Sequence, residues 1–392
     1  MPTVLFVVNE AYFFVSHRLP VARAAARCGL EVHVAAPADH VWAPDGFDVD
    51  EIEKAGFQYH SIRLSRRGKN IAAEARSFFD IYRVMRLVRP DLVHFLTIKP
   101  TLYGGVAARL LGIPAMVVGL TGLGQVFVEQ RPQTRLIRLV VARLLGFIAR
   151  HPNSRLIVQN QGDWDTLLDR GVKASKLALV RGSGVSLHEY RKVPEPDDVP
   201  LVILPSRLIW EKGVREFVMA AAKLKASGVV ARFALVGDTK TSNPRSVPRA
   251  QLENWVQEGT IEWWGRRTDM PSVYAQCHIV CLPTTYGEGV PRALIEAAAC
   301  GRPIVATDTH GCREVVRDAY NGILVKSNDV AGLEDALRRL INDPELRSRY
   351  GERGRAIVAR ELSEESVVGL TMDIYAKLLR LPLNLSEATR SV

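Results

Sequence analysis

The chain has 392 residues, which exceeds what one hydrophobic core usually organises and predicts two domains. Hydrophobic residues make up 47% and charged residues 24%, a globular composition that excludes disordered, collagen-like and disulfide-scaffold proteins. The formal net charge of +10 favours an anionic partner.

The cysteines and the N-terminus indicate a cytosolic protein. Five scattered cysteines lack metal-cluster spacing and are interpreted as reduced thiols: Cys28, Cys277, Cys281, Cys300 and Cys312. The first residues run directly into a strand pattern without a basic segment ahead of it, so no signal peptide is predicted. Zinc-finger spacing and RNP-type aromatic motifs are missing, and nucleic acid is therefore not expected as a partner.

In the first half of the chain, strand-like apolar runs alternate with helix-period segments. The predicted strands are 4–8, 32–35, 92–96, 115–119 and 156–159. Such alternation predicts a parallel α/β sheet. We therefore expect a Rossmann-like domain over residues 1–185.

The turns after these strands do not carry a dinucleotide fingerprint. Residues 9–14, after the first strand, contain no glycine, which disfavours an NAD site. Gly122-Leu123-Gly124 follows a later strand but lacks the third glycine. Its loop, with Thr121, either presents backbone N–H groups to a phosphate or sugar, or is a plain turn.

The segment 136–149 is nearly apolar but contains Arg138 and Arg143, and it falls short of the roughly 20 residues of a membrane-spanning helix. It is either an amphipathic helix lying on an anionic membrane or a core helix with solvated arginines. The sequence pattern is compatible with either helix.

The second half repeats the pattern after a proline-rich polar stretch. The stretch between residues 181 and 200 is predicted to contain the domain linker, which ends at about 200. The strands expected beyond it are 201–205, 233–236, 261–263, 279–282 and 304–306. A second Rossmann-like domain is expected over 201–362, facing the first across a cleft, with the helical segment 363–392 packing back across the joint.

The most informative segment, residues 286–297, follows one of these strands and opens a helix. Glu288 lies in the loop, with Glu296 about two turns into the helix. Gly287 and Gly289, followed by Val290, allow close approach of a ligand, and the helix N-terminus favours an anion.

A basic pair follows the first strand of the second domain. Arg207 offers a bidentate fork and Lys212 a point charge, which together suit a diphosphate. Both cations would offset the charge that develops on a departing nucleoside diphosphate.

In this setting, the Glu-x7-Glu motif and the basic pair resemble the retaining glycosyltransferases of the GT-B fold, family 4. The resemblance implies that Glu288 contacts the donor sugar, that Glu296 binds the ribose hydroxyls and that Arg207 and Lys212 hold the donor phosphates. Further matches lie at 236–238, 264–266 and 301–305, and the resemblance places the loop at Arg266 against the nucleotide base.

Motifs in the first half narrow the resemblance. Residues 13–20, 99–105 and 121–124 look like the branch that extends polyprenyl-diphosphate-linked sugars in bacterial surface-glycan or protein-glycosylation pathways. That branch implies a UDP-sugar donor, expected to carry an N-acetylhexosamine or hexose. It also implies a polyprenyl-diphosphate-linked acceptor and a peripheral location at the cytoplasmic membrane face. The basic residues Arg63, Arg66, Arg67, Lys69 and those of 131–150 fit such an acceptor.

One departure concerns the catalytic base. Many relatives carry a histidine where this chain has Thr121. His17, predicted in the first strand–helix loop, is the candidate near acceptor or phosphate, and His94, within a strand, is interpreted as a core residue. The family is thought to let the leaving diphosphate oxygen take the acceptor proton, which makes a separate base dispensable.

A metal requirement is not expected. Two Asp-x-Asp matches, at 48–50 and 163–165, lie in the first domain, the second at a helix start where acids complement the dipole. No cofactor beyond the nucleotide-sugar co-substrate is predicted. The competing functions are a nucleotide-sugar epimerase or hydrolase on the same fold, and a non-catalytic basic binder of nucleic acid or anionic surfaces.

Overall fold

The computed structural model describes residues 1–38, 47–64, 70–122, 135–240, 243–285, 287 and 289–382, without the side chains of 135–138 and 140. The chain divides into two compact units. One unit comprises residues 1–184 together with 364–392, and the other comprises 185–363.

The first unit contains a seven-stranded sheet with strand order β3-β2-β1-β4-β5-β6-β7, in which all paired strands are parallel. Its strands are β1 (Thr3–Val7), β2 (Glu31–Ala36), β3 (Gln58–Ser61), β4 (Leu92–Leu96), β5 (Ala115–Leu120), β6 (Ser154–Val158) and β7 (Leu177–Leu179).

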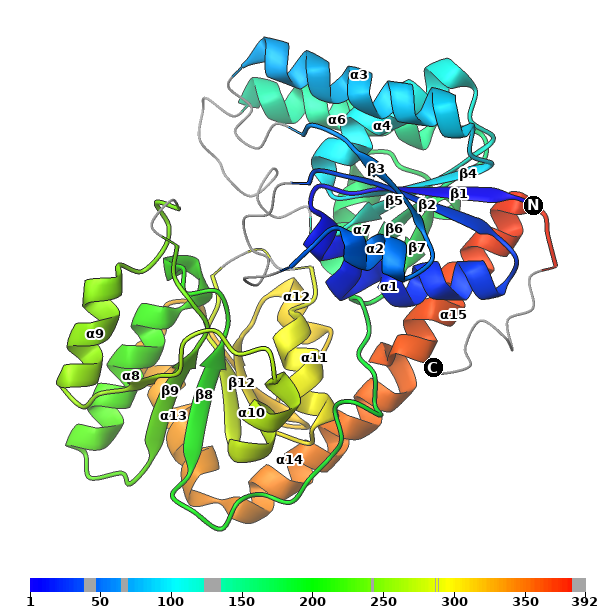
Figure 1. Cartoon of the computed structure of the whole chain (residues 1–392). Coiled ribbons are helices and arrows are strands. Elements are labelled where there is room, and N and C mark those ends of the chain that lie inside the picture. Colours follow the sequence, from blue (N-terminus) through cyan, green and yellow to red (C-terminus); the bar gives the residue numbers. More distant parts are fainter. Residues whose placement is uncertain are drawn as a thin grey trace. The chain divides into compact units, whose positions relative to one another are not determined.

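Helices cover both faces of this sheet (Figure 1). One face is covered by α1 (Ala11–Arg27), α2 (Asp50–Lys54) and the last helix, α15 (Glu364–Leu379). The other is covered by α3 (Ile71–Val88), α4 (Ile98–Leu111), α6 (Arg135–Ala149) and α7 (Gln161–Asp169), which is followed by the short η2 (Ala174–Lys176). Because β1, β4 and β5 are buried on both faces, they are almost continuously apolar.

The second unit contains a six-stranded parallel sheet with strand order β10-β9-β8-β11-β12-β13. Its strands are β8 (Leu201–Pro205), β9 (Arg232–Val236), β10 (Glu262–Trp263), β11 (Ile279–Leu282), β12 (Ile304–Thr307) and β13 (Gly322–Val325).

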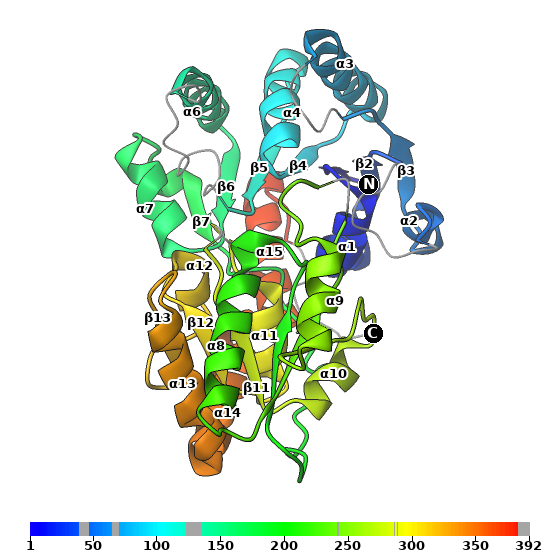
Figure 2. The same ribbon diagram turned by 90° about the vertical axis from the view of Figure 1, so that its left-hand side faces the viewer.

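Helices also cover both faces of the second sheet. On one face, α8 (Val214–Ala226) and α13 (Val330–Asn342) lie side by side (Figure 2), with α9 (Arg249–Gln257) packing into the same core. The other face carries α10 (Met270–Gln276), α11 (Arg292–Ala299), α12 (His310–Arg313) and η4 (Val358–Leu362). η3 (Trp210–Lys212) precedes α8, and α14 (Pro344–Ile357) runs into η4. The predicted architecture of two Rossmann-like parallel sheets is confirmed.

The segment predicted as a linker packs on the second sheet. Val185 and Tyr190 are buried in the second unit's core. The Tyr190 carbonyl also accepts a hydrogen bond from Arg355. The backbone N–H of Val185 donates to the carbonyl of Leu362 at 3.3 Å, so the two points where the chain passes between units are adjacent within the second unit.

Candidate functional site

The predicted phosphate and sugar residues lie on two neighbouring loops of the second sheet. Strand order reverses between β8 and β11, and ligands of parallel α/β sheets bind outside the carboxyl ends of strands at such a point. Arg207 and Lys212 follow β8, whereas Gly287, Gly289 and Val290 follow β11. The fold therefore brings both groups to one sheet edge.

The loop after β8 is held by backbone hydrogen bonds to the strand and loop beside it. The N–H of Ser206 donates to the Val236 carbonyl at 3.0 Å, and the N–H of Leu208 donates to the Asp238 carbonyl at 3.0 Å. Arg207 is exposed on this loop, while Lys212 is only 8% exposed. Arg207 is therefore solvated, whereas Lys212 is largely buried.

The loops after β8 and β11 are joined through η3. The Glu211 carbonyl accepts hydrogen bonds from the Thr285 N–H at 2.9 Å and from the Thr284 hydroxyl at 3.0 Å. Gly213 has φ +77°, and a Cβ there would lie 2.1 Å from the Pro283 carbonyl oxygen. Only glycine permits this approach, which fixes Lys212 beside the loop leading to Gly287.

Glu296 lies in a buried hydrogen-bond network. Because α11 begins only at Arg292, Glu296 lies about one turn into the helix rather than the two predicted. Its Oε1 accepts from the Tyr190 hydroxyl at 3.0 Å and from Arg292 Nε at 2.8 Å, and its Oε2 accepts from the Tyr274 hydroxyl at 3.0 Å. Glu296 is 7% exposed. Among the described residues, these three donors fix the carboxylate.

Sequence reasoning missed the partners of Glu296. Arg292 precedes it by one helical turn, an i,i+4 pairing that the sequence does contain. Tyr190 and Tyr274 are distant in sequence and gave no signal. Burial, followed by the charge of Glu296, raises the pKa of both tyrosine hydroxyls, so they remain protonated donors.

The start of α11 suits an anion. Its N-cap, Pro291, provides no side-chain cap, and its first turn contains no acidic residue. The N-terminal amide groups and the helix dipole therefore favour a negatively charged ligand there. Glu288, predicted to contact the donor sugar, lies outside the described residues, as do Gly124, Arg66, Arg67, Lys69 and Arg131.

Arg266, predicted to lie near the nucleotide base, is exposed on the loop after β10. The preceding Gly265 has φ +66°, and its carbonyl accepts from the Gly237 N–H at 2.8 Å. This hydrogen bond joins the loops after β9 and β10, at the same sheet edge as Arg207.

In the first unit, the prediction that His17 lies in a strand–helix loop was wrong. α1 already begins at Ala11, because Phe14, Val21 and Ala25 recur at helical spacing and are buried against the sheet. His17 lies within the helix, stacks on Phe13 with 4.7 Å between ring centroids, and its Nδ1 is 2.7 Å from Ser16 Oγ. Thr121 and Gly122 follow β5 and are half-buried.

Exposed basic and apolar side chains share the outer face of α3. Arg76, Phe79, Arg83, Arg86 and Leu87 are all exposed and recur at helical spacing. Phe79 is 63% and Leu87 73% exposed. This set is called the α3 stripe below.

α6 divides its apolar residues between the core and the surface. Val141, Leu145 and Ile148 pack in the core of the first unit, whereas Leu139 and Phe147 are exposed. Arg143 and Arg150 are exposed as well. Arg63, by contrast, makes a two-point hydrogen-bonded ion pair with Asp80.

The described part of the chain contains no group of three or more His, Cys, Asp or Glu side chains that could hold a metal ion. Asp163 lies in the first turn of α7, as predicted, and Asp50 opens α2. Within the same described ranges, no helix meets the length and hydropathy needed to cross a bilayer.

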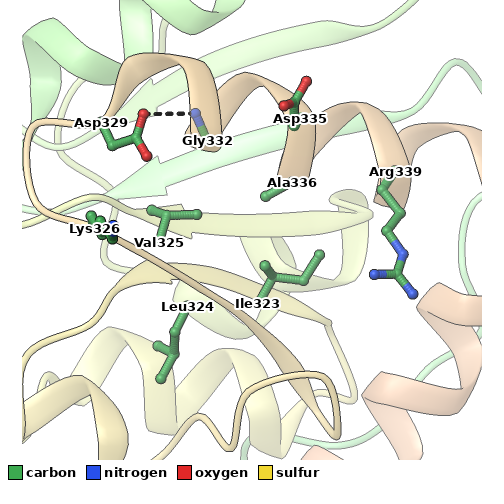
Figure 3. Close-up of a pocket in the computed structure, with 9 residues that line it drawn as sticks. All are labelled: Ile323, Leu324, Val325, Lys326, Asp329, Gly332, Asp335, Ala336 and Arg339. Atoms are coloured by element: carbon green, nitrogen blue, oxygen red, sulfur yellow. Dashed lines mark hydrogen bonds between the residues drawn. The ribbon is translucent and has the colours of Figure 1, made fainter.

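A hollow of ≈ 370 Å³ lies away from these loops, between the edge strand β13 and α13. Figure 3 shows its lining, with Asp329 capping α13 through a 2.9 Å hydrogen bond from the Gly332 N–H. None of the predicted site residues lines it.

Two family models match the chain. Residues 188–357 match the model described as glycosyl transferases group 1, and residues 3–151 match the one described as glycosyl transferase 4-like. Each match falls largely within one compact unit.

Curated relatives are similar over much of the chain. The N,N'-diacetylbacillosaminyl-diphospho-undecaprenol alpha-1,3-N-acetylgalactosaminyltransferase of Campylobacter jejuni is 26% identical over 93% of this chain and 95% of its own. The UDP-Gal:alpha-D-GlcNAc-diphosphoundecaprenol alpha-1,3-galactosyltransferase of Escherichia coli is 23% identical over 71% of this chain and 73% of its own. Among solved structures, Anabaena HepE in complex with UDP has a TM-score of 0.76 at 20% identity, covering 97% of this chain and 100% of its own.

Proposed function

Because this chain belongs to the group 1 glycosyltransferases and has the GT-B fold, we propose that it moves a sugar from a UDP-sugar to a polyprenyl-diphosphate-linked saccharide, with retention of anomeric configuration. The transferred sugar is an N-acetylhexosamine or hexose. The relatives support this choice, since two of them are named for transferring N-acetylgalactosamine or galactose to diphospho-undecaprenol-linked sugars.

The proposal rests on the hydrogen bonds that join the loop after β8 to the loop after β11, where the strand order of the second sheet reverses. Lys212 is seated beside the loop that follows β11 because Glu211 and Gly213 attach to that loop. A UDP diphosphate placed there would meet Lys212, Arg207 and the N-terminus of α11. These groups offset the charge that builds on the leaving UDP in the transition state.

The proposal also assigns a role to each of the two glutamates. Glu288 contacts the donor sugar, and Glu296 binds the ribose hydroxyls. Each carboxylate oxygen has two lone pairs, and among the described residues Oε2 of Glu296 accepts one hydrogen bond, from Tyr274, leaving a lone pair for a hydroxyl. Arg266 lies along the base.

The transfer needs no separate protein base. The leaving diphosphate oxygen takes the acceptor's hydroxyl proton on the face where the new glycosidic bond forms. The donor's anomeric bond to phosphate breaks on that same face, so the configuration is retained. No metal ion is required in this scheme, because protein cations meet the diphosphate.

The acceptor reaches the first unit from the cytoplasmic face of the membrane. The α3 stripe supports this placement, because its arginines can meet anionic headgroups while Phe79 and Leu87 enter the interface. The exposed Phe147 and Arg143 of α6 add to the same kind of surface.

The deciding experiment is a screen of UDP- and GDP-sugars against a short-chain polyprenyl-diphosphate-linked saccharide, with product mass and anomeric configuration as the readout. A glycosylated lipid with retained configuration is expected, formed equally well in EDTA. Arg207→Ala should lower turnover 10²-fold or more, as expected for loss of a transition-state charge contact. The exposed Arg215→Ala of α8 is the matched control and should keep wild-type turnover.

Other products would identify the competing functions. Free sugar or an epimerised nucleotide sugar without glycolipid would indicate a hydrolase or epimerase. Salt-sensitive binding to nucleic acid that is unchanged by Glu288→Ala, without transfer to lipid, would indicate a basic binder. An inverted product would contradict retention.

A further inference from the structure

A buried arginine of the first unit lacks a compensating charge. Arg18, on the sheet-facing side of α1, is 6% exposed, and its Nε has no hydrogen-bond partner in the described part of the chain. No carboxylate pairs with it among the described residues. Burial lowers the pKa of its guanidinium to about 10, which still leaves it charged at neutral pH. An uncompensated buried cation is costly and is a natural binding point for an anion.

A second unpartnered donor lies near Arg18. His94, in β4, is 2% exposed, and its Nδ1 is 2.6 Å from the Tyr375 hydroxyl of α15. Its Nε2 is buried and has no hydrogen-bond partner within the ranges that the structure describes. Burial and the nearby Arg18 hold the pKa of His94 well below its usual range, so the ring is neutral. When Tyr375 donates to Nδ1, the ring proton lies on Nε2.

The free nitrogen of His94 points toward the carboxyl end of the sheet. Although His94 pairs with Val117 in register, its Nε2 lies over Gly119, where a Cβ would approach it to 3.2 Å. Gly119 is the second-last residue of β5, and Thr121 is the first residue after that strand. Because Gly119 has no side chain, nothing from that residue covers Nε2.

Arg18 and His94 also flank the strand-order reversal of the first sheet. β1 and β4 are neighbours there, with Arg18 on the helix after β1 and His94 on β4 itself. Helical side chains tilt toward the helix N-terminus, which for α1 is the carboxyl end of β1. This is where ligands of parallel sheets bind.

We propose that Arg18 and His94 form an anion subsite of the first unit that binds a phosphoryl group of the acceptor. Two donors, one of them cationic, match the acceptor-only oxygens of a phosphate. The identity of the phosphate source rests on the proposed function, in which the acceptor carries a diphosphate. The subsite itself rests only on the geometry of the first unit.

The test separates this subsite from the UDP site. Inorganic pyrophosphate is titrated calorimetrically into the full chain already saturated with UDP, so that the second unit's phosphate site is filled. One further equivalent is expected to bind. Arg18→Met should weaken that binding at least tenfold, and Arg18→Lys, which keeps the charge but not the guanidinium fork, should weaken it less. UDP affinity should be equal in all variants.

The matched control is Arg23→Met, an exposed arginine of the same helix, which should leave the titration unchanged. Thermal unfolding provides a readout that distinguishes binding from structure. Arg18→Met removes an unpaired buried charge and should melt no lower than the wild type, whereas an arginine kept for stability would give the opposite result.

Acceptor kinetics identify the phosphate source. Arg18→Met should raise the acceptor KM at least tenfold while changing kcat less than threefold. A pyrophosphate site with unchanged acceptor KM would overturn assignment to the acceptor. Absence of further binding at saturating UDP, or a lone water between Arg18 and His94 in crystals soaked with pyrophosphate, would overturn the subsite. Failure of transfer with every donor would instead overturn the proposed function, with the titration unaffected.

Discussion

Glu296 is the clearest example of a residue whose position the protein fixes before any ligand arrives. Its carboxylate is nearly excluded from solvent, and three donors from separate parts of the second unit hold it. A preoriented carboxylate loses little conformational entropy when it meets a ribose. In the proposed function, the tyrosines therefore contribute to binding by positioning Glu296.

The first prediction concerns one of these donors. Tyr274→Phe should lower the free energy of unfolding of the second unit by about 1.5–3 kcal/mol, the usual contribution of a hydrogen bond to a charged group, and should weaken UDP binding. Urea denaturation and calorimetry measure the two effects. Tyr350→Phe is the control, since this buried tyrosine of the same unit makes no hydrogen bond through its hydroxyl within the described structure. Equal effects of both substitutions would contradict the positioning role.

The second prediction concerns the junction between the two loops. Gly213→Ala places a Cβ against the Pro283 carbonyl and should weaken UDP binding at least tenfold, because the loop carrying Lys212 must shift. Gly228→Ala is a matched control, since Gly228 has a similar φ of +81° but open space around its Cβ position. Its cost should be limited to the roughly 1–2 kcal/mol of the left-handed backbone. UDP affinities of the two variants, measured side by side, test this contrast.

At the scale of elements, the sequence predicted the central strands well and missed strands at the sheet edges. The runs at 92–96, 201–205 and 279–282 match β4, β8 and β11, because strands buried on both faces are continuously apolar. The missed strands β3, β7 and β13 are edge strands of their sheets, whereas the fourth edge strand, β10, was predicted at 261–263. A strand such as β3, with sequence QYHS, has no apolar run to detect.

The candidate site was predictable where its residues form local patterns. Arg207, Lys212 and the loop residues after β11 follow strands that the hydrophobic pattern already places. Tyr190 and Tyr274 were not predictable, because their role depends on contacts across more than one element of the second unit. Arg18 was overlooked for a related reason. It is buried because it lies within the long helix α1, and the aromatic residues at the start of α1 obscured where that helix begins.

The third prediction concerns the α3 stripe. Arg83→Gln and Arg86→Gln should each weaken binding to vesicles containing anionic phosphatidylglycerol about fivefold. This follows because each basic residue near an anionic surface contributes about 1 kcal/mol to membrane binding. Arg23→Gln, on the helix covering the opposite sheet face, is the control. Vesicle flotation at two salt concentrations measures the effect, which should shrink at high salt. Equal flotation of all variants would show that α3 does not belong to the membrane-binding surface.

At the scale of the whole molecule, the two units have separate hydrophobic cores. α15, although last in the chain, contributes Val367, Met372 and Tyr375 to the core of the first unit. The second unit's cores include none of these residues. We therefore expect a substitution in one core to act mainly on the stability of its own unit.

The fourth prediction follows from this separation. Met372→Ala should lower the free energy of unfolding of the first unit by about 2–5 kcal/mol, the usual cost of emptying a buried methionine site. UDP should raise the melting temperature of the second unit only, since a ligand stabilises the unit that binds it. Differential scanning calorimetry with and without UDP tests both effects. A UDP-dependent shift in the transition that Met372→Ala lowers would contradict the assignment.

The return of the chain to the first unit makes residues 185–363 a contiguous insertion with neighbouring ends. Val185 and Ser363 form a parallel bridge, so the entry and exit points of the insertion adjoin each other. Residues 185–363, which we propose bind the nucleotide, would thus be exchanged through two adjacent junctions, without interrupting the other unit. If the proposed function holds, chimaeras built this way from homologous enzymes would transfer donor selectivity to an unchanged first unit.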